Sequence, residues 1–142
     1  MSSIPDNSQP DLDSLRIEII VDEDVTFVVD EESLRRAAAM AAAHRGFTRG
    51  EIGIRVTGDQ IIHQINREHL GHDYPTDVIS FAYNAQPPRI EGELVASVDT
   101  ALRRASELGW STEHELLLYV VHGVLHVTGM DDGEANDRAD MR

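Results

Sequence analysis

The sequence predicts a single α+β domain, in which a mixed sheet of about four strands is covered by helices. Three observations lead to this fold class. Apolar residues make up 41% and charged residues 27% of the 142 residues, which is typical of one folded domain. Segments in which apolar and polar residues alternate are interleaved with segments that carry helix signals. Near the C-terminal end, a nearly continuous apolar stretch indicates a buried central helix.

The strands are expected in four places. Residues 1–14 are polar and should form a flexible tail before a domain over 15–142. Alternating patterns then predict a first strand in the β-rich segment from Leu15, and further strands over Ile52–Val56, Asp77–Tyr83 and Glu93–Val98. The segment Asn84–Arg89 contains two prolines and is expected to be a loop.

The helices are expected between the strands and at the end of the chain. Asp30, Asp59 and Asp99 are interpreted as N-caps, and Thr112 with Glu115 as a capping box. Glycines should end the helices, so that the predicted ranges are Asp30–Arg45 before Gly46, Asp59–Leu70 before Gly71, Asp99–Leu108 before Gly109, and Thr112–Val127.

Composition excludes several classes of protein. The chain has no cysteine, so disulfides and thiolate metal sites are excluded and a metal must be held by His, Asp or Glu. No apolar run is long enough to cross a bilayer and the N-terminus lacks signal-peptide features, so we expect a cytoplasmic protein without a membrane contact. The net charge of −14 opposes binding to nucleic acid.

Two histidines inside the apolar helix indicate a metal site. His122 and His126 are four residues apart, so on a helix they point the same way. Gly129 can end the helix, and the turn after it can bring Asp132 beneath the two imidazoles. Three protein ligands and one open position are the arrangement of a catalytic zinc, which makes a hydroxide near neutral pH. The alternative is that both histidines are hydrogen-bonded core residues.

The same spacing occurs in zinc peptidases, where a glutamate after the first histidine acts as the general base. That position is Gly123 here, and a glycine cannot accept a proton. A metallopeptidase is therefore the weaker hypothesis.

Three strings resemble the motifs of the YbeY family of bacterial metal-dependent endoribonucleases. The first runs from His122 to Asp132. The second comprises Asn66 and Leu70–Phe81, and the third is Gly92–Ser97. They occur in the order found in that family, and the resemblance extends over nearly everything from Leu15 onward.

The resemblance implies an α+β fold with a metal cleft beside the sheet. It implies cleavage of single-stranded RNA, in 3′-end maturation of small-subunit ribosomal RNA and in ribosome quality control. His122 and His126 take the roles of zinc ligands, and the expected partners are single-stranded ribosomal RNA and the small ribosomal subunit, with a ribosomal protein or an assembly GTPase delivering the substrate. Thr76, Asp77, Ser80 and Phe81 are expected to line the cleft, although these strand residues are equally suited to a structural role.

The chain departs from the family pattern at two positions. Asp132 stands where the third ligand is usually histidine, which lowers the charge of the metal centre, shifts activity to higher pH and also suits Fe²⁺ or Mn²⁺. Leu70 stands where many members carry an arginine, and Arg67 is a candidate to replace it. Asp131 either orients a ligand or water, or caps the turn. A metal-binding ribosome-assembly factor without nuclease activity is the alternative to an enzyme.

Overall fold

The computed structural model describes residues 14–130, which form one mixed four-stranded sheet with helices around it. The strands lie in the order β1-β2-β4-β3. β1 pairs with β2 and β2 with β4 in parallel, whereas β3 and β4 form an antiparallel hairpin. The predicted α+β class is therefore confirmed. The elements in chain order are β1 (Leu15–Val21), α3 (Glu31–His44), β2 (Arg49–Thr57), α4 (Asp59–Leu70), β3 (Val78–Gln86), β4 (Arg89–Ser97), α5 (Val98–Leu108) and α6 (Thr112–Val127).

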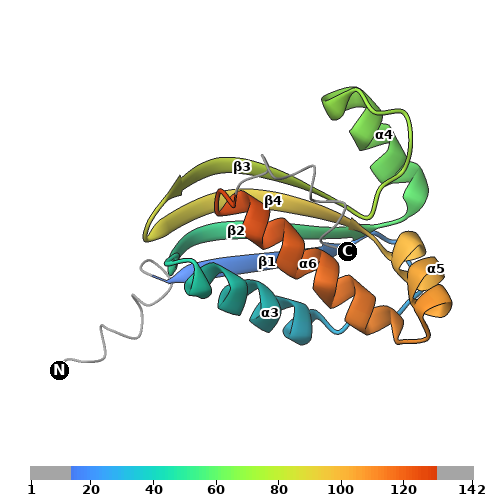
Figure 1. Cartoon of the computed structure of the whole chain (residues 1–142), viewed down its shortest axis with the longest axis horizontal. Coiled ribbons are helices and arrows are strands. Elements are labelled where there is room, and N and C mark those ends of the chain that lie inside the picture. The colour runs from blue at the N-terminus through green and yellow to red at the C-terminus, as the bar shows by residue number, and fades with distance from the viewer. Residues whose placement is uncertain (1–13, 131–142) are drawn as a thin grey trace.

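The main core lies between the sheet and the helices α3 and α6, which cover the same face of the sheet (Figure 1). Alternate strand residues point to this face, as the period of a strand requires. On α6 the buried positions recur at helical spacing, and the opposite side of the helix is only half-buried. The helix is thus central, but only one of its sides is fully buried. The largest buried core residues include Leu34, Ile52, Ile54, Ile90, Leu94, Leu116, Tyr119 and Val124.

Helix α4 packs on the opposite face of the sheet. Leu94 and Ala96 of β4 belong to the core beneath α6, whereas Val95 between them packs with Ile62 of α4 and Ile79 of β3. Neighbouring residues of a strand point to opposite faces, so α4 and α6 lie on different sides of β4. The ring of His69, near the end of α4, meets the ring of Phe81 on the edge strand β3, which places the end of α4 beside that edge.

Asp59 joins α4 to α5 and β4. Its carboxylate accepts hydrogen bonds from Ser97 Oγ at 2.6 Å, Thr100 Oγ1 at 2.7 Å and Arg103 Nη1 at 2.8 Å. Burial raises the pKa of Asp59, but these three hydrogen bonds outweigh it and hold the pKa below its ordinary value. Its backbone N–H donates to Asp99 Oδ2 at 2.8 Å.

The helix caps partly correct the sequence-based expectations. Asp30 caps α3 as predicted, and Gly46, Gly71 and Gly109 follow their helices with positive φ. Asp59, Asp99 and Thr112 are not N-caps, because each lies inside its helix. The N-cap residues are Gly58, Ser97 and Ser111, and Glu115 accepts from Trp110 Nε1 instead of completing a capping box.

The expected loop over Asn84–Arg89 is also wrong. β3 continues to Gln86 and β4 begins at Arg89, so only Pro87 and Pro88 form the turn. Pairing with β4 holds the strand there despite the adjacent prolines, with a register irregularity between Ala82 and Asn84. Within residues 14–130, no helix is long and apolar enough to cross a membrane.

Candidate functional site

His122 and His126 both lie on α6 and are half-buried. Ser111 caps this helix by accepting from the backbone N–H of His114, and the helix is continuous through both histidines. Four residues make slightly more than one turn, so the two imidazoles lie on the same side of α6, one turn apart. This side is distinct from the fully buried side that packs on the sheet.

Two glycines allow α6 to approach the sheet closely beside the histidines. A Cβ on Gly123 would lie 2.8 Å from Leu94 Cδ2, and a Cβ on Gly92 would lie within 2.4 Å of Val127 Cγ1. Both distances are shorter than any ordinary contact between carbon atoms. Gly123 therefore has a packing role. The sequence alone indicated only that this position lacks a general base.

The end of α6 has the geometry that the sequence predicts. Gly129 has a φ of +93°, and its N–H donates to the carbonyl of His126 at 2.9 Å. The N–H of Met130 donates to the carbonyl of Leu125 at 3.1 Å, which completes a Schellman motif. Asp131 and Asp132 follow directly and lie outside the described residues. Within 14–130, no three His, Asp or Glu side chains are grouped to hold a metal.

A cavity of about 240 Å³ opens beside His126. It lies where the edge strand β3, the end of α4 and the loop between them meet the end of α6. Of the residues expected to line a cleft, Thr76 and Ser80 line this cavity, and Leu70 does so as well. The other lining residues are Asn66, His72, Tyr74, Val78 and Ile79. Among the described residues that line it, none is Asp or Glu, although the whole chain carries a net charge of −14.

Asn66 holds the loop that forms one wall of this cavity. It is 2% exposed, and its Nδ2 donates to the carbonyl of Tyr74 at 2.9 Å. The backbone carbonyl of Asn66 accepts from the N–H groups of Gly71 and His72. The side-chain amide and the backbone carbonyl of Asn66 together fix the path of residues 71–74.

Asp77 begins β3. Its Oδ1 accepts from Val78 N at 2.7 Å and from Thr76 Oγ1 at 3.3 Å, and its carbonyl accepts from Ser97 N at 2.9 Å. Asp77 is not among the residues that line the cavity. These contacts give it a structural role at the start of the strand.

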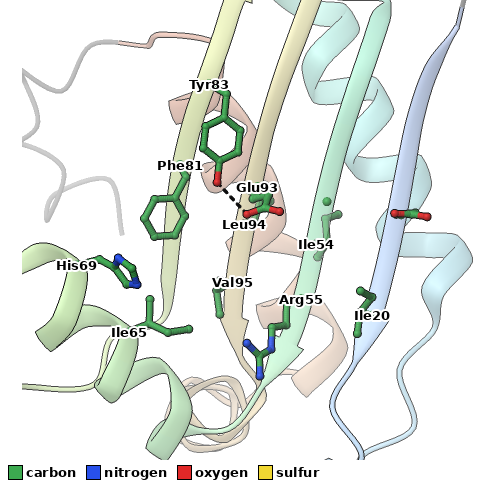
Figure 2. Close-up of a pocket in the computed structure, with 12 residues that line it drawn as sticks. Ile20, Ile54, Arg55, Ile65, His69, Phe81, Tyr83, Glu93, Leu94 and Val95 are labelled. Atoms are coloured by element: carbon green, nitrogen blue, oxygen red, sulfur yellow. Dashed lines mark hydrogen bonds between the residues drawn. The ribbon is translucent and has the colours of Figure 1, made fainter.

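Phe81 lies on the other face of the sheet from Ser80. It lines a second cavity of about 650 Å³ with Ile65 and His69 of α4, and its ring meets the His69 ring edge-on at 6.0 Å between centroids (Figure 2). Figure 2 also shows Tyr83 and Glu93 on this face, joined by a hydrogen bond of 2.9 Å. Ser80 lines the cavity beside His126 and Phe81 does not.

Arg67 forms an ion pair with Asp73 and does not line the cavity. Its Nη1 lies 3.6 Å from Asp73 Oδ1, which His63 Nε2 also contacts at 2.9 Å. The hydrogen bond from His63 is the main cause that lowers the pKa of Asp73. Leu70 does line the cavity, and it is 47% exposed.

His72 and Tyr74 line the cavity and were not singled out by the sequence. Tyr74 Oη and His72 Nδ1 are 2.8 Å apart. Their position between Leu70 and Thr76 was the feature of the sequence that could have indicated them. Spacing in a loop, however, does not show which side chains face the cavity.

Comparison with known proteins shows the family of the chain. Residues 10–142 match the model of the family described as Endoribonuclease YbeY. The chain belongs to the YbeY family. An Endoribonuclease YbeY of Rhodopirellula baltica is 57% identical over 111 residues, covering 77% of this chain and 57% of that protein. The chain thus spans little more than half of that relative. An Endoribonuclease YbeY of Chloroherpeton thalassium is 42% identical over 123 residues, covering 87% of this chain and 86% of the relative.

A solved structure supports the fold. The solution structure of a Thermotoga maritima protein matches with a TM-score of 0.54 and 22% identity, covering 81% of this chain and 73% of that one. The family resemblance inferred from the His122, Leu70 and Gly92 strings is therefore confirmed, and the arrangement of helices around the sheet occurs in a known structure.

Proposed function

We propose that this YbeY family chain is a metal-dependent endoribonuclease that cleaves single-stranded RNA and acts in the 3′-end maturation of small-subunit ribosomal RNA and in ribosome quality control. The names of its relatives support the nuclease activity. The observation that carries the proposal is the position of His126, which lies one helical turn from His122 and lines a cavity without a carboxylate among its described lining residues.

The donor set suits one divalent cation. His122 and His126 offer two imidazole nitrogens from one side of a rigid helix, and the Schellman turn at Gly129 redirects the chain immediately before Asp132. We assign the third ligand to Asp132, with Zn²⁺ as the metal and Fe²⁺ or Mn²⁺ as alternatives suited to two imidazoles and one carboxylate. When bound, such an ion supplies Lewis acidity for activating water and neutralising phosphate charge.

The residues of the cavity are suited to an RNA strand. Thr76 and Ser80 present hydroxyl groups on the β3 wall, which can donate to phosphate or sugar oxygens. Asp131 is assigned to orienting a ligand or the attacking water. The small ribosomal subunit is the proposed site of action in the cytoplasm, with a ribosomal protein or an assembly GTPase delivering the RNA.

A second candidate function is a metal-binding assembly factor without nuclease activity. It is favoured by Leu70, which lines the cavity where many family members are expected to have an arginine, and by the net charge of −14. The position of Gly123 against Leu94 leaves no side chain there that could serve as a peptidase base.

One experiment distinguishes these functions. Metal content is measured on untreated protein, and cleavage of single-stranded and double-stranded RNA is followed with and without chelator, for the native chain and for His126→Ala. His114→Ala is the matched control, because His114 is an exposed histidine on the same helix. The nuclease is supported if single-stranded RNA is cut, chelator stops cleavage and only His126→Ala is inactive. Bound metal with no cleavage supports the assembly factor.

A further inference from the structure

We propose that His72 binds a phosphate oxygen of the RNA through its Nε2–H, in the tautomer that the Tyr74 hydroxyl selects. This inference rests on the proposed nuclease function. It names a substrate-binding residue for that same cavity and accounts for part of the role that an arginine at position 70 would have.

His72 and Tyr74 line the same cavity as His126, and they lie on the loop that directly follows Leu70. The side chain of Leu70 has no hydrogen-bond donor, and Arg67 pairs with Asp73 and does not line the cavity. Among the residues that line this cavity, His72 and His126 are the histidines, and His126 is assigned to the metal.

A hydrogen bond joins the side chains of His72 and Tyr74. Tyr74 Oη lies 2.8 Å from His72 Nδ1, and the rings are tilted with centroids 5.4 Å apart. A phenol is a better donor than a neutral imidazole N–H, so Tyr74 donates and Nδ1 accepts. A neutral imidazole has one ring proton, which is then on Nε2. In this tautomer His72 presents an Nε2–H donor.

Several contacts hold the loop around His72 in place. The buried Asn66 holds the carbonyl of Tyr74 and the N–H of His72. Asp73, between the two aromatic residues, is held by His63 and Arg67. A donor held in place in this way loses little conformational freedom on binding, which favours recognition of a phosphate.

The experiment measures binding separately from cleavage. A fluorescein-labelled single-stranded RNA is titrated with the full chain and followed by anisotropy, and a gel run after each titration verifies that the RNA is intact. His72→Ala should weaken binding roughly tenfold, the size expected for one hydrogen bond to a charged acceptor. His72→Gln, which keeps an N–H donor, should recover most of this loss. The matched control is His69→Ala, an exposed histidine three residues earlier that lines the cavity on the other face.

Tyr74→Phe tests the tautomer. It should weaken binding roughly threefold in the native chain and not at all in the His72→Ala background, because Tyr74 acts through His72. The ¹⁵N shifts of the His72 ring should show the proton on Nε2 in the native chain, with this preference reduced in Tyr74→Phe.

Three outcomes would overturn the inference. The first is equal binding by His72→Ala and His69→Ala, and the second is a proton on Nδ1 of His72. In both cases the nuclease function stands if the native chain cuts RNA. The third outcome, in which the native chain neither binds nor cuts single-stranded RNA, removes the proposed function together with the inference.

Discussion

Replacing Gly92 by alanine tests how closely α6 must approach the sheet. The added Cβ would lie 2.4 Å from Val127 Cγ1, 3.2 Å from Val127 Cγ2 and 2.8 Å from the backbone carbonyl oxygen of Phe81. Val127 is 1% exposed and Phe81 O belongs to the paired strand β3, so neither can move freely. Overpacking of this kind costs about 2 kcal/mol in the free energy of unfolding. For a chain of 142 residues this lowers the melting temperature by roughly 7 °C.

The assay is thermal unfolding followed by circular dichroism. Gly53→Ala is the matched control, because Gly53 is also a strand glycine of the same sheet and its added Cβ would meet Glu93 Cγ at an ordinary 3.5 Å. Its melting temperature should stay within about 2 °C of the native value. Since Val127 adjoins His126, Gly92→Ala should also bind metal more weakly than Gly53→Ala. A melting temperature for Gly92→Ala equal to that of the control would refute the packing argument.

Three further changes have defined expectations. Asp22 accepts two hydrogen bonds from Arg55, each 2.9 Å long, and the Arg55 side chain lowers its pKa. Asp22→Asn should therefore lower the free energy of unfolding by about 1 kcal/mol at pH 7. This difference from the native chain should disappear as the pH falls below the lowered pKa of Asp22, since the protonated acid no longer forms the ion pair. Urea unfolding at pH 7 and at a pH below that pKa measures both effects. Leu70→Arg should raise kcat/KM for single-stranded RNA roughly tenfold with an unchanged melting temperature, and an unchanged rate counts against the missing-arginine argument. Gly129→Ala, at a φ of +93°, should cost about 1 kcal/mol in urea unfolding, and an unaltered midpoint would contradict the left-handed helix end.

The fold class and the helix ends could be predicted from the sequence because they depend on local signals. Gly46, Gly71, Gly109 and Gly129 all have positive φ where the sequence predicts that a helix ends. Alternating apolar residues marked the strands, and the three motif strings predicted the family.

The errors occurred where side chains bond to distant elements. Asp59 and Asp99 are of the residue type that often forms N-caps. Instead, the Asp59 carboxylate accepts hydrogen bonds from β4 and α5, and the Asp99 carboxylate accepts one from the first backbone N–H of α4. Nothing in the local sequence distinguishes these bonds from capping. In the same way, the turn at Pro87 and Pro88 is short because the pairing of β3 with β4 extends to Gln86 and Arg89, and this pairing is a tertiary effect.

The candidate site was predicted in part. Thr76 and Ser80 line the cavity beside His126 and Phe81 lines the cavity on the other face, and a contact of these residues with RNA stays a prediction. The inward orientation of His72 depends on the loop held by Asn66, which no pattern in the sequence describes. The roles of Asp131 and Asp132 lie outside the described residues and stay predictions.

The central claim is that the end of α6 holds one catalytic cation, and zinc affinity tests it most directly. Chelator-treated protein is titrated with Zn²⁺ in competition with a chromophoric chelator, for the native chain, His122→Ala, His126→Ala, Asp132→Ala and the control His114→Ala. We expect one tight site in the native chain and in the control, and a loss of at least about a hundredfold in affinity in the other three variants. Equal affinity in His126→Ala and His114→Ala would contradict the claim.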